Sequence, residues 1–217
     1  MKTVAIIDYN CGNIFSICNA LKSHDIPFAI VETATELQKY DRAILPGVGA
    51  FPNAIKLLDQ LGLLDGITKF VASGRLLFGI CVGLQVMMDN GLEQGKTNGL
   101  GLIGGDVAPL PLVASTGEPL KIPHIAWSGL EPGPTFGQEF GQTSPLRSCA
   151  PGSQFYFVHS FAVRPNDPKH ILATAQYNGI QFCAAAGRDN IFGTQFHPER
   201  SGAVGLRLLR EFATLST

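Results

Sequence analysis

Cys81 stands where an apolar run ends, with Gly79 two residues before it and Gly83 two residues after it. The run before Cys81 predicts a strand, and the apolar residues after it, up to Met88, predict a buried helix. Glycines allow a tight turn and close approach of neighbouring backbone. A thiol at such a junction lies at a helix N-terminus, where the dipole favours the nucleophilic thiolate. Cys81 is therefore a candidate nucleophile, with an unreactive core cysteine as the alternative.

A histidine and a glutamate near the end of the chain could complete a catalytic group. A cysteine nucleophile needs a base and a residue that orients the base. His197 precedes Pro198 and Glu199, and the proline biases His197 toward extended backbone. In an extended segment His197 and Glu199 face the same side, so Glu199 would hold the imidazole while the other ring nitrogen takes the thiol proton. A strand end with a solvated carboxylate is the alternative.

The loop Pro46–Gly49 follows a predicted strand over residues 42–45, just as Cys81 follows one over residues 76–80. In open α/β sheets the carboxyl edge of the strands is where ligands bind. A glycine-rich turn at that edge presents backbone N–H groups, so this loop is a candidate oxyanion hole. An ordinary strand-to-helix turn is the alternative.

The elements that must position these residues alternate between strand and helix. We predict strands over 3–8, 28–31, 42–45 and 76–80, and helices over 14–21, 54–61 and 64–72, with a helical turn at 36–37. Asn13 is the expected N-cap of the first helix. This alternation predicts an α/β fold with an open, mostly parallel central sheet and helices on both faces.

The second half of the chain is rich in short β-type runs, and its Asn178-Gly179 pair is typical of a tight hairpin. We therefore expect additional antiparallel strands in the C-terminal half, then a closing helix over 201–214. Loops are expected at 108–119 and 131–152, the second being a solvated loop or an interaction surface. The whole chain, residues 1–217, is expected to form one domain. The predicted β-type runs are 101–107, 120–123, 155–163, 171–177, 180–186 and 190–196.

Composition narrows the function further. Of 217 residues 45% are hydrophobic and 15% charged, and the net charge is -1. This composition indicates a globular protein. No surplus of basic residues favours binding to nucleic acid or to an anionic membrane. No apolar run is long enough to span a bilayer. The five cysteines are widely spaced without a Cys-x-x-Cys pair, which argues against disulfides and zinc and favours the cytoplasm. No phosphate-binding loop with lysine is present, so we expect no nucleotide, no metal and no other cofactor.

Several motifs together resemble one known family. The segments 79–85 and 195–199 are similar to those of the class I, triad-type glutamine amidotransferases. The remaining motifs resemble the glutaminase subunits of imidazole glycerol phosphate synthase, and the likeness extends over essentially the whole chain. These motifs are Asp8–Asn13, Leu45–Phe51, Pro123–Trp127 and Tyr156–Phe161.

The resemblance implies hydrolysis of glutamine through a cysteine thioester. It also implies a (β/α)₈-barrel cyclase as partner, which uses the ammonia to form imidazole glycerol phosphate and AICAR in histidine biosynthesis. The roles that it implies are catalysis by Cys81, His197 and Glu199; an oxyanion hole from Val48, Gly49 and Val82; glutamine binding by Gln85, Glu93, His159, Ser160 and Phe161; and a partner interface at Asn13, Trp127 and Tyr156.

Some positions depart from the family's usual pattern. Val82 and Leu84 replace the usual Leu and Met of the elbow, Ser128 replaces Asn after Trp127, and Cys11 replaces Gly or Pro. None of these is a triad residue, so glutaminase chemistry is expected to survive. The open alternatives are a paralogous subunit that supplies ammonia for surface-sugar amidination, a catalytically silent regulatory subunit and a stand-alone thiol hydrolase. For Trp127 and Tyr156 the alternative is ordinary aromatic core packing.

Overall fold

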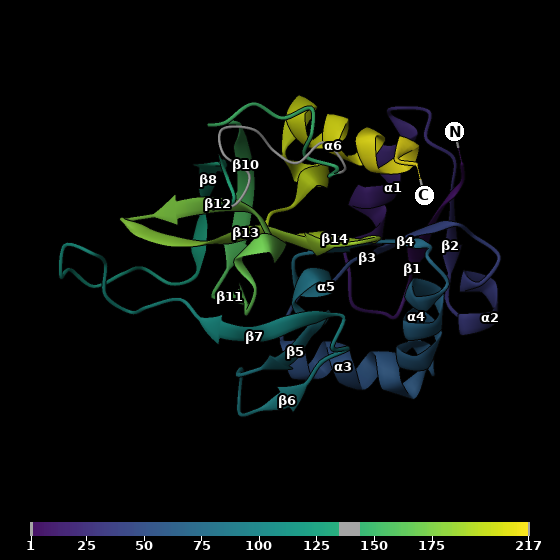
Figure 1. The fold of residues 1–217 in the computed structure, drawn as a ribbon, viewed down its shortest axis with the longest axis horizontal. Helices are drawn as coiled ribbons and strands as arrows, with labels where there is room; N and C mark the ends of the chain where they lie inside the picture. Colours follow the sequence, from purple (N-terminus) through teal and green to yellow (C-terminus); the bar gives the residue numbers. More distant parts are fainter. Residues whose placement is uncertain (1, 135–143, 217) are drawn as a thin grey trace.

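A computed structural model describes residues 2–134 and 144–216. Its centre is an eight-stranded sheet in which the first four strands of the chain and β14 run parallel, while the last three strands of the sheet add antiparallel pairs (Figure 1). In order across the sheet, the strands are β2 (Phe28–Val31), β1 (Val4–Ile7), β3 (Arg42–Leu45), β4 (Leu76–Ile80), β14 (Ile191–Thr194), β13 (Ile180–Arg188), β12 (Ile171–Tyr177) and β9 (Glu131–Pro132).

Helices cover both faces of this sheet. Figure 1 shows α1 and α6 together on one face and α3 and α4 on the other, with α2 packed against α4. The expected mixed architecture, parallel in the centre with antiparallel strands added from the C-terminal half, is confirmed. The helices are α1 (Ile14–Lys22), α2 (Ala34–Leu37), α3 (Phe51–Gln60), α4 (Leu63–Ala72), α5 (Val82–Gln85) and α6 (Gly202–Thr214).

Two smaller sheets lie beside the central one. Strands β8 and β10 form an antiparallel pair, and β11, β7, β5 and β6 form a four-stranded sheet. Two short 3₁₀ turns, η1 (Pro168–His170) and η2 (Pro198–Arg200), complete the described elements. The strands of the smaller sheets are β5 (Met88–Gly91), β6 (Thr97–Asn98), β7 (Ile103–Pro109), β8 (His124–Gly129), β10 (Gln154–His159) and β11 (Phe161–Pro165).

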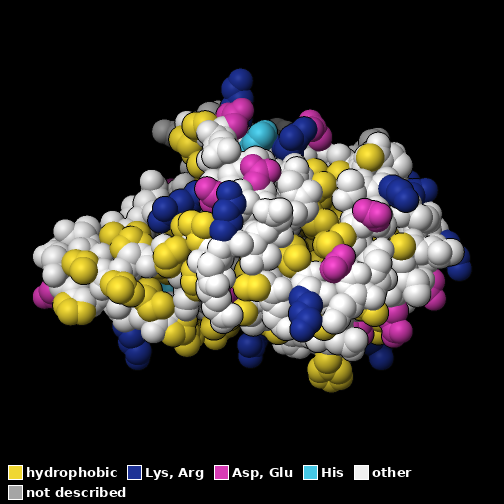
Figure 2. Space-filling model, turned by 90° about the horizontal axis from the view of Figure 1, so that it is seen from below, with side chains coloured by type: hydrophobic (Ala, Val, Ile, Leu, Met, Phe, Trp, Pro, Cys, Tyr) yellow, Lys and Arg dark blue, Asp and Glu magenta, His cyan; other side chains and the backbone are white. Residues whose placement is uncertain are grey.

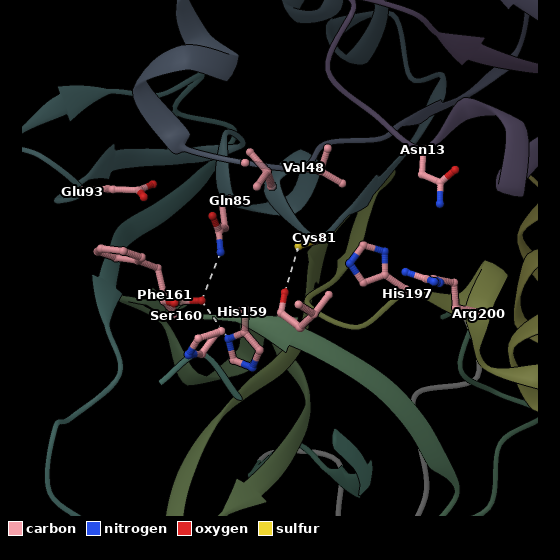
Figure 3. A pocket seen from close by; sticks show the side chains of 14 residues that line it. Asn13, Val48, Cys81, Gln85, Glu93, His159, Ser160, Phe161, His197 and Arg200 are labelled. Carbon is pink, nitrogen blue, oxygen red and sulfur yellow. Dashed lines mark hydrogen bonds between the residues drawn. The ribbon is translucent and has the colours of Figure 1, made fainter. Parts of the chain in front are cut away.

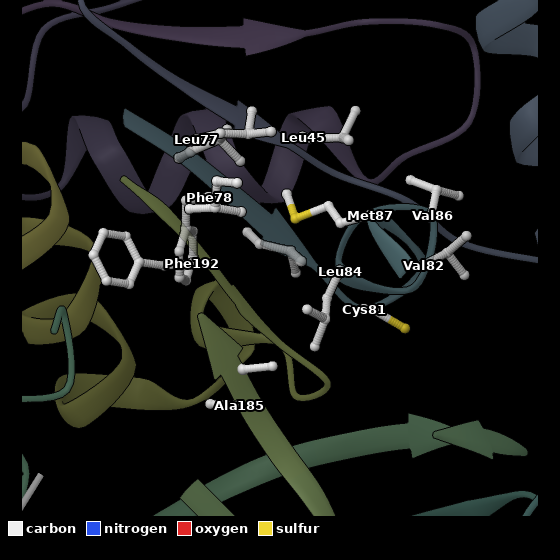
Figure 4. Packing of buried hydrophobic residues seen from close by; sticks show 14 of the residues in the cluster. Leu45, Leu77, Phe78, Cys81, Val82, Leu84, Val86, Met87, Ala185 and Phe192 are labelled. Carbon is white, nitrogen blue, oxygen red and sulfur yellow. The ribbon is translucent and has the colours of Figure 1, made fainter. Parts of the chain in front are cut away.

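The central strands are buried from end to end, because helices cover a parallel sheet on both faces. Around the turn after β4, Cys81 belongs to a buried cluster that also contains the side chains of Leu45, Phe78, Leu84 and Met87 (Figure 4). A close-packed core resists displacement, so the backbone that carries Cys81 is held firmly.

The predicted strands over 28–31, 42–45 and 76–80 are confirmed, and so is Asn13 as the N-cap of α1, where its side chain accepts from the N–H of Ser16 at 3.3 Å. The Asn178-Gly179 hairpin is also confirmed, since both residues have positive φ, at 46° and 78°. These features follow from local sequence alone, which explains why they were predictable.

Three predictions from the β-type runs and the apolar stretch after Cys81 were wrong. The helix after Cys81 stops at Gln85, and Met88 begins β5. The segment 120–123 is not a strand, and pairing starts at His124, after Pro123, which has no N–H to donate. The run 155–163 is two strands, β10 and β11, which pair with β8 and β7 respectively. In each case the pairing of strands in the folded protein set the type and the bounds of the element, and the local pattern of residue types does not show this pairing.

The two expected loops are partly structured. Residues 108 and 109 extend β7, and Val113 and Pro119 form an isolated bridge further along that segment. In the segment 131–152, residues 131 and 132 form β9, while 135–143 lie outside the described residues.

Among the described residues no helix is both long and apolar enough to cross a membrane.

Candidate active site

Cys81 lies on a strained turn between β4 and α5. Its backbone has φ 55° and ψ −111°, a conformation that costs free energy for a residue with a side chain and that gathers at functional sites. The surrounding structure imposes it: the N–H of Cys81 donates to the carbonyl of Thr194 at 2.7 Å, and the carbonyl of Cys81 accepts from Leu84 at 3.0 Å. This strand–turn–helix elbow presents the side chain at the carboxyl edge of the sheet.

Both glycines around Cys81 are required by close packing. A Cβ on Gly83 would overlap the carbonyl oxygen of Leu45, and a Cβ on Gly79 would press on the backbone of α5. The expectation that these glycines serve close approach is therefore confirmed.

His197 and Glu199 form a buried pair. The Nδ1 atom of His197 lies 2.9 Å from Oε1 of Glu199, whose side chain is 1% exposed. We expected the two residues to lie on one extended segment. They do not, because the chain turns into η2 at Pro198. The turn nevertheless brings the carboxylate under the ring, and a carboxylate at Nδ1 fixes the tautomer that leaves Nε2 toward the pocket.

The other ring nitrogen of His197 is directed to the thiol side. Nε2 is buried and has no hydrogen-bond partner among the described residues, and Figure 3 shows the ring beside Cys81. Burial lowers the pKa of His197, but the nearby Cys81 thiol and the Glu199 carboxylate together raise it to about 10. The imidazole therefore holds a proton at neutral pH.

A cavity of about 280 Å³ opens above Cys81. It contains almost every residue that the resemblance assigns to catalysis, to the oxyanion or to glutamine (Figure 3). Glu199 lies behind His197, outside the lining. Among the described residues no group of three or more His, Cys, Asp or Glu side chains could hold a metal ion. The lining residues are Asn13, Val48, Gly49, Cys81, Val82, Gln85, Glu93, Pro123, Val158, His159, Ser160, Phe161, His197 and Arg200.

The loop after β3 is held by two side chains from the segment after β1. The hydroxyl of Tyr9 donates to the carbonyl of Pro46 at 2.8 Å, and the thiol of Cys11 donates to the carbonyl of Val48 at 2.9 Å. Burial, followed by Cys11 and Cys81, raises the pKa of Tyr9 well above its usual value, so its hydroxyl keeps its proton. Because a trans peptide is planar, the N–H of Gly49 points away from Cys11.

Glu93 lies in the turn between β5 and β6, at the far end of the cavity from His197 (Figure 3). The sequence suggested that Glu93 lies on or just past the helix after Cys81. This prediction was wrong, since that helix has only four residues. One carboxylate oxygen accepts from the N–H of Phe51 at 2.8 Å, at the start of α3. An anion is favourable at this helix N-terminus, and it gives this end of the cavity a negative charge.

Two buried histidines form a directed chain of hydrogen bonds. Nδ1 of His159 donates to the carbonyl of Phe161 at 2.9 Å, Nε2 of His159 accepts from Nδ1 of His124 at 3.0 Å, and Nε2 of His124 accepts from the hydroxyl of Ser128 at 3.2 Å. Burial lowers the pKa of His159 to about 3 and that of His124 to about 4. Both rings are therefore neutral at pH 7, and the backbone carbonyl at one end fixes the tautomer of each.

Sequence reasoning assigned no role to Gln195, His124, Cys11 or Arg200. Gln195 donates to the sulfur of Cys81 at 3.6 Å. A polar residue inside the apolar end of a strand was the available signal, because buried polar side chains have partners. The partners of His124 and Cys11 depend on tertiary contacts and could not be read from spacing.

The three residues expected at a partner interface lie near the mouth of the cavity or on the adjacent β8–β10 pair. Asn13 lines the cavity, while Trp127 and Tyr156 are cross-strand partners whose rings meet edge to face at 6.1 Å. Trp127 is 52% exposed, so core packing is wrong for this residue. A further group of exposed hydrophobic side chains, which includes Leu112, occupies the end of the molecule formed by residues 108–121 (left in Figure 2).

The sequence matches the family "Glutamine amidotransferase class-I" over residues 5–214. The chain belongs to this family of glutamine-hydrolysing enzymes. A crystal structure of a glutamine amidotransferase superposes with a TM-score of 0.71 at 20% identity, covering 98% of this chain and 97% of that chain.

Within that class, the chain is similar to HisH subunits. The chain is 40% identical to the imidazole glycerol phosphate synthase subunit HisH of Geobacillus thermodenitrificans, over 100% of this chain and 98% of the relative. It is 41% identical to the same subunit of Rhodopirellula baltica, over 97% of each. At this identity and coverage the chain belongs to the HisH family.

Proposed function

We propose that the chain is the glutaminase subunit of an imidazole glycerol phosphate synthase, with Cys81, His197 and Glu199 as its catalytic triad. The observation that carries the proposal is the buried His197–Glu199 pair, whose remaining ring nitrogen faces the cavity that also contains Cys81. A nucleophile, a base and an orienting carboxylate in this order are the parts that acyl transfer needs.

In the first half of the reaction, Cys81 attacks the side-chain amide carbon of L-glutamine. His197 has taken the thiol proton, in keeping with its raised pKa, and the C–N bond breaks as that proton passes to the leaving ammonia. Backbone N–H groups of Val48, Gly49 and Val82 are the proposed donors to the oxyanion. Donors that are already in place cost no reorganisation during the reaction, which is why they lower the barrier.

In the second half, water attacks the γ-glutamyl thioester on Cys81. His197, now neutral, removes a proton from that water, and the thiolate leaves as glutamate forms. Glu199 holds Nδ1 throughout, so Nε2 serves both proton transfers. The cycle returns the enzyme to its starting state with one glutamate and one ammonia released.

Glutamine recognition is assigned to residues at the other end of the cavity. The carboxylate of Glu93 would pair with the substrate ammonium, and its position opposite His197 supports this orientation. Gln85 and the segment His159–Phe161 line the space between. We propose that these residues hold the amino-acid end while the amide reaches Cys81.

The ammonia must reach an acceptor before water protonates it, because ammonium is not a nucleophile. We propose that it passes through an enclosed channel into a (β/α)₈-barrel cyclase bound as a heterodimer, which completes a lyase-type synthesis of imidazole glycerol phosphate and AICAR. Exposed Trp127, its cross-strand partner Tyr156, and Asn13 are the proposed contact residues. The five free thiols suit the cytoplasm.

The test is glutamate release from glutamine by the purified chain, with and without the cyclase and the ligand of the cyclase, and with Cys81→Ala as control. The proposal predicts low activity alone, a rise of orders of magnitude with partner and ligand, and no activity in Cys81→Ala. Inactivity with the histidine-pathway cyclase would indicate the paralogous or the silent subunit. Full activity of the chain alone would indicate a stand-alone hydrolase.

A further inference from the structure

Gln195 is the polar side chain closest to the nucleophile for which the proposed mechanism has no use. It follows β14, two residues before His197, and is 0% exposed. Its Nε2 lies 3.6 Å from Sγ of Cys81, and its Oε1 accepts from Nε2 of Gln85 at 3.0 Å. A buried amide with both ends engaged is oriented, not merely accommodated.

The orientation of this amide follows from a backbone carbonyl. The carbonyl oxygen of Phe161 can only accept, so Gln85 must present its NH₂ group to it, at 3.1 Å. The same NH₂ group then faces Gln195, which must answer with its oxygen. Gln195 is therefore left with its NH₂ group toward Cys81. Rotating either amide by 180° would oppose two donors or two acceptors.

The carbonyl of Phe161 is itself anchored from the other side. It also accepts from Nδ1 of His159, whose ring is bound to His124 and, through it, to Ser128 on β8. A continuous buried network thus runs from Ser128 to the sulfur of Cys81. Because each link allows one donor direction, the network holds the amide of Gln195 in a single orientation.

We propose that Gln195 is a further catalytic residue, whose side-chain N–H donates to the Cys81 sulfur and stabilises its thiolate form. This inference rests on the proposed function of Cys81 as nucleophile. The carbonyl of Val158, 4.0 Å from the sulfur, can only accept and so favours the thiol. The Gln195 amide is the neutral donor that opposes it. A donor to the charged form shifts the ionisation equilibrium toward that form.

The same hydrogen bond has opposite effects on two properties of the thiolate. It raises the fraction of Cys81 that is ionised, and it lowers the intrinsic reactivity of each thiolate, with a Brønsted coefficient of about 0.4–0.5. A shift of about one pH unit in ionisation, typical of one hydrogen bond to an anion, would then be accompanied by about a threefold change in intrinsic reactivity. A residue with a purely structural role would not couple the two changes in opposite directions.

Other ionisable groups surround the sulfur and must be common to the proteins compared. They approach from every neighbouring element and include the base itself. These groups are His197 with Glu199 behind it, Arg200 of η2, His159 of β10, Glu93 after β5, and Tyr9 and Cys11 after β1. Changing only Gln195 leaves all of them in place.

The experiment is alkylation of the full chain by iodoacetamide between pH 5 and 10, followed by mass spectrometry of the peptide that contains Cys81. Gln195→Met removes the donor at nearly constant volume, and Gln176→Met, on the exposed side of β12, is the matched control. For Gln195→Met we expect the alkylation midpoint to rise by about one pH unit. Below the midpoint the variant reacts about threefold more slowly than the native protein, and on the high-pH plateau about threefold faster.

A second measurement needs no substitution at the buried site, which guards against a misfolded variant. In the native chain, the ¹⁵N resonance of the Gln195 side-chain amide should move with pH at the midpoint of Cys81 alkylation. In Cys81→Ala that movement should disappear. An amide resonance that ignores the ionisation of Cys81 would overturn the proposal whether or not Gln195→Met folds.

The outcomes separate this inference from the proposed function. A shifted midpoint with crossing rate curves supports the role of Gln195, even if the chain hydrolyses no glutamine with any partner. An unshifted midpoint in a folded Gln195→Met protein overturns the role, even if the native chain is an active glutaminase. If both stand, kcat for glutamine at a pH below the alkylation midpoint of Cys81 should fall about threefold while KM changes little, because the donor contacts sulfur and not the amino-acid end.

Discussion

The thiol of Cys11 donates to the carbonyl oxygen of Val48 at 2.9 Å, which ties the loop that follows β3 to the segment that follows β1. Tyr9 makes the parallel bond to Pro46 two residues earlier. The peptide that begins at Val48 carries the N–H of Gly49, one of the proposed donors to the oxyanion. We therefore expect Cys11 to influence the reaction through the backbone, without contacting the substrate.

Replacing Cys11 tests this influence. Cys11→Ala removes one hydrogen bond, worth about 1 kcal/mol, and we expect kcat for glutamine to fall about fivefold with little change in KM. Cys11→Ser retains a hydroxyl donor and should recover most of the loss. Cys18→Ala, a half-buried cysteine on α1, serves as control. Equal kcat values for native, Cys11→Ala and Cys11→Ser proteins would show that the bond is irrelevant.

Gly83→Ala should disrupt the elbow itself. The added methyl group would overlap the carbonyl of Leu45, so the variant should lose about 3 kcal/mol or more of unfolding free energy, as overpacked cores do. Urea unfolding measures this loss. Gly104→Ala is the matched control, because its new methyl group would meet only atoms at 3.8 Å and should cost less than about 1 kcal/mol. Similar losses for the two variants would refute the packing account.

The contacts of His197 with Cys81 and Glu199 make stability depend on pH in a defined direction. The pKa of His197 is about 10 in the folded protein, above its value of about 6.5 in unfolded chains. The folded state therefore binds the proton more tightly. The stabilisation is complete below about pH 6.5 and is lost as pH rises toward 10.

Glu199→Gln tests that direction. Without the carboxylate the pKa of His197 should fall, which NMR titration of the ring would detect. The difference in unfolding free energy between native protein and Glu199→Gln should be larger at pH 7 than at pH 10, because His197 loses its charge in between. A difference that grows toward pH 10 would mean that the pair is not an ion pair at neutral pH.

Trp127→Ala probes the proposed partner face. Exposed aromatic side chains often dominate binding energy, so we expect at least a tenfold weaker association with the cyclase, measured by titration calorimetry. The folded chain alone should lose less than about 1 kcal/mol, the scale of one aromatic pair. Leu112→Ala, also exposed but at the 108–121 end of the molecule, should bind normally. Unchanged binding of the cyclase by Trp127→Ala would place the interface elsewhere.

Much of the central sheet could be predicted because its signals are local. The segments 43–45 and 76–80 are continuous apolar runs, as expected for strands covered on both faces. The pair Gly79 and Gly83 around Cys81 likewise indicated a turn. The backbone conformation of Cys81 could not be predicted, because tertiary contacts impose it. One contact is with Thr194, which is distant in sequence, and the other is with α5, whose position is decided by packing.

The parts that sequence reasoning missed depend on contacts between distant segments. His124 looked like one residue of a motif, but its place between His159 and Ser128 requires the pairing of β8 with β10. Met88 looked helical because it continues an apolar run, yet it pairs with Ile103 of β7. The contact between His197 and Glu199 was predicted correctly, but from an extended backbone instead of the observed 3₁₀ turn. Both conformations can bring the same two side chains together.

The central claim is that Cys81 carries the glutamyl group, and the most direct measurement is to find it there. The chain, with its cyclase, would be mixed with glutamine, quenched in acid during turnover and mapped by peptide mass spectrometry. The account predicts a glutamyl adduct on the Cys81 peptide, removed by hydroxylamine as a thioester should be. The adduct should be absent from the other four cysteines and from Cys81→Ala. Glutamate formation with Cys81 unmodified, and equally fast in Cys81→Ala, would contradict the account.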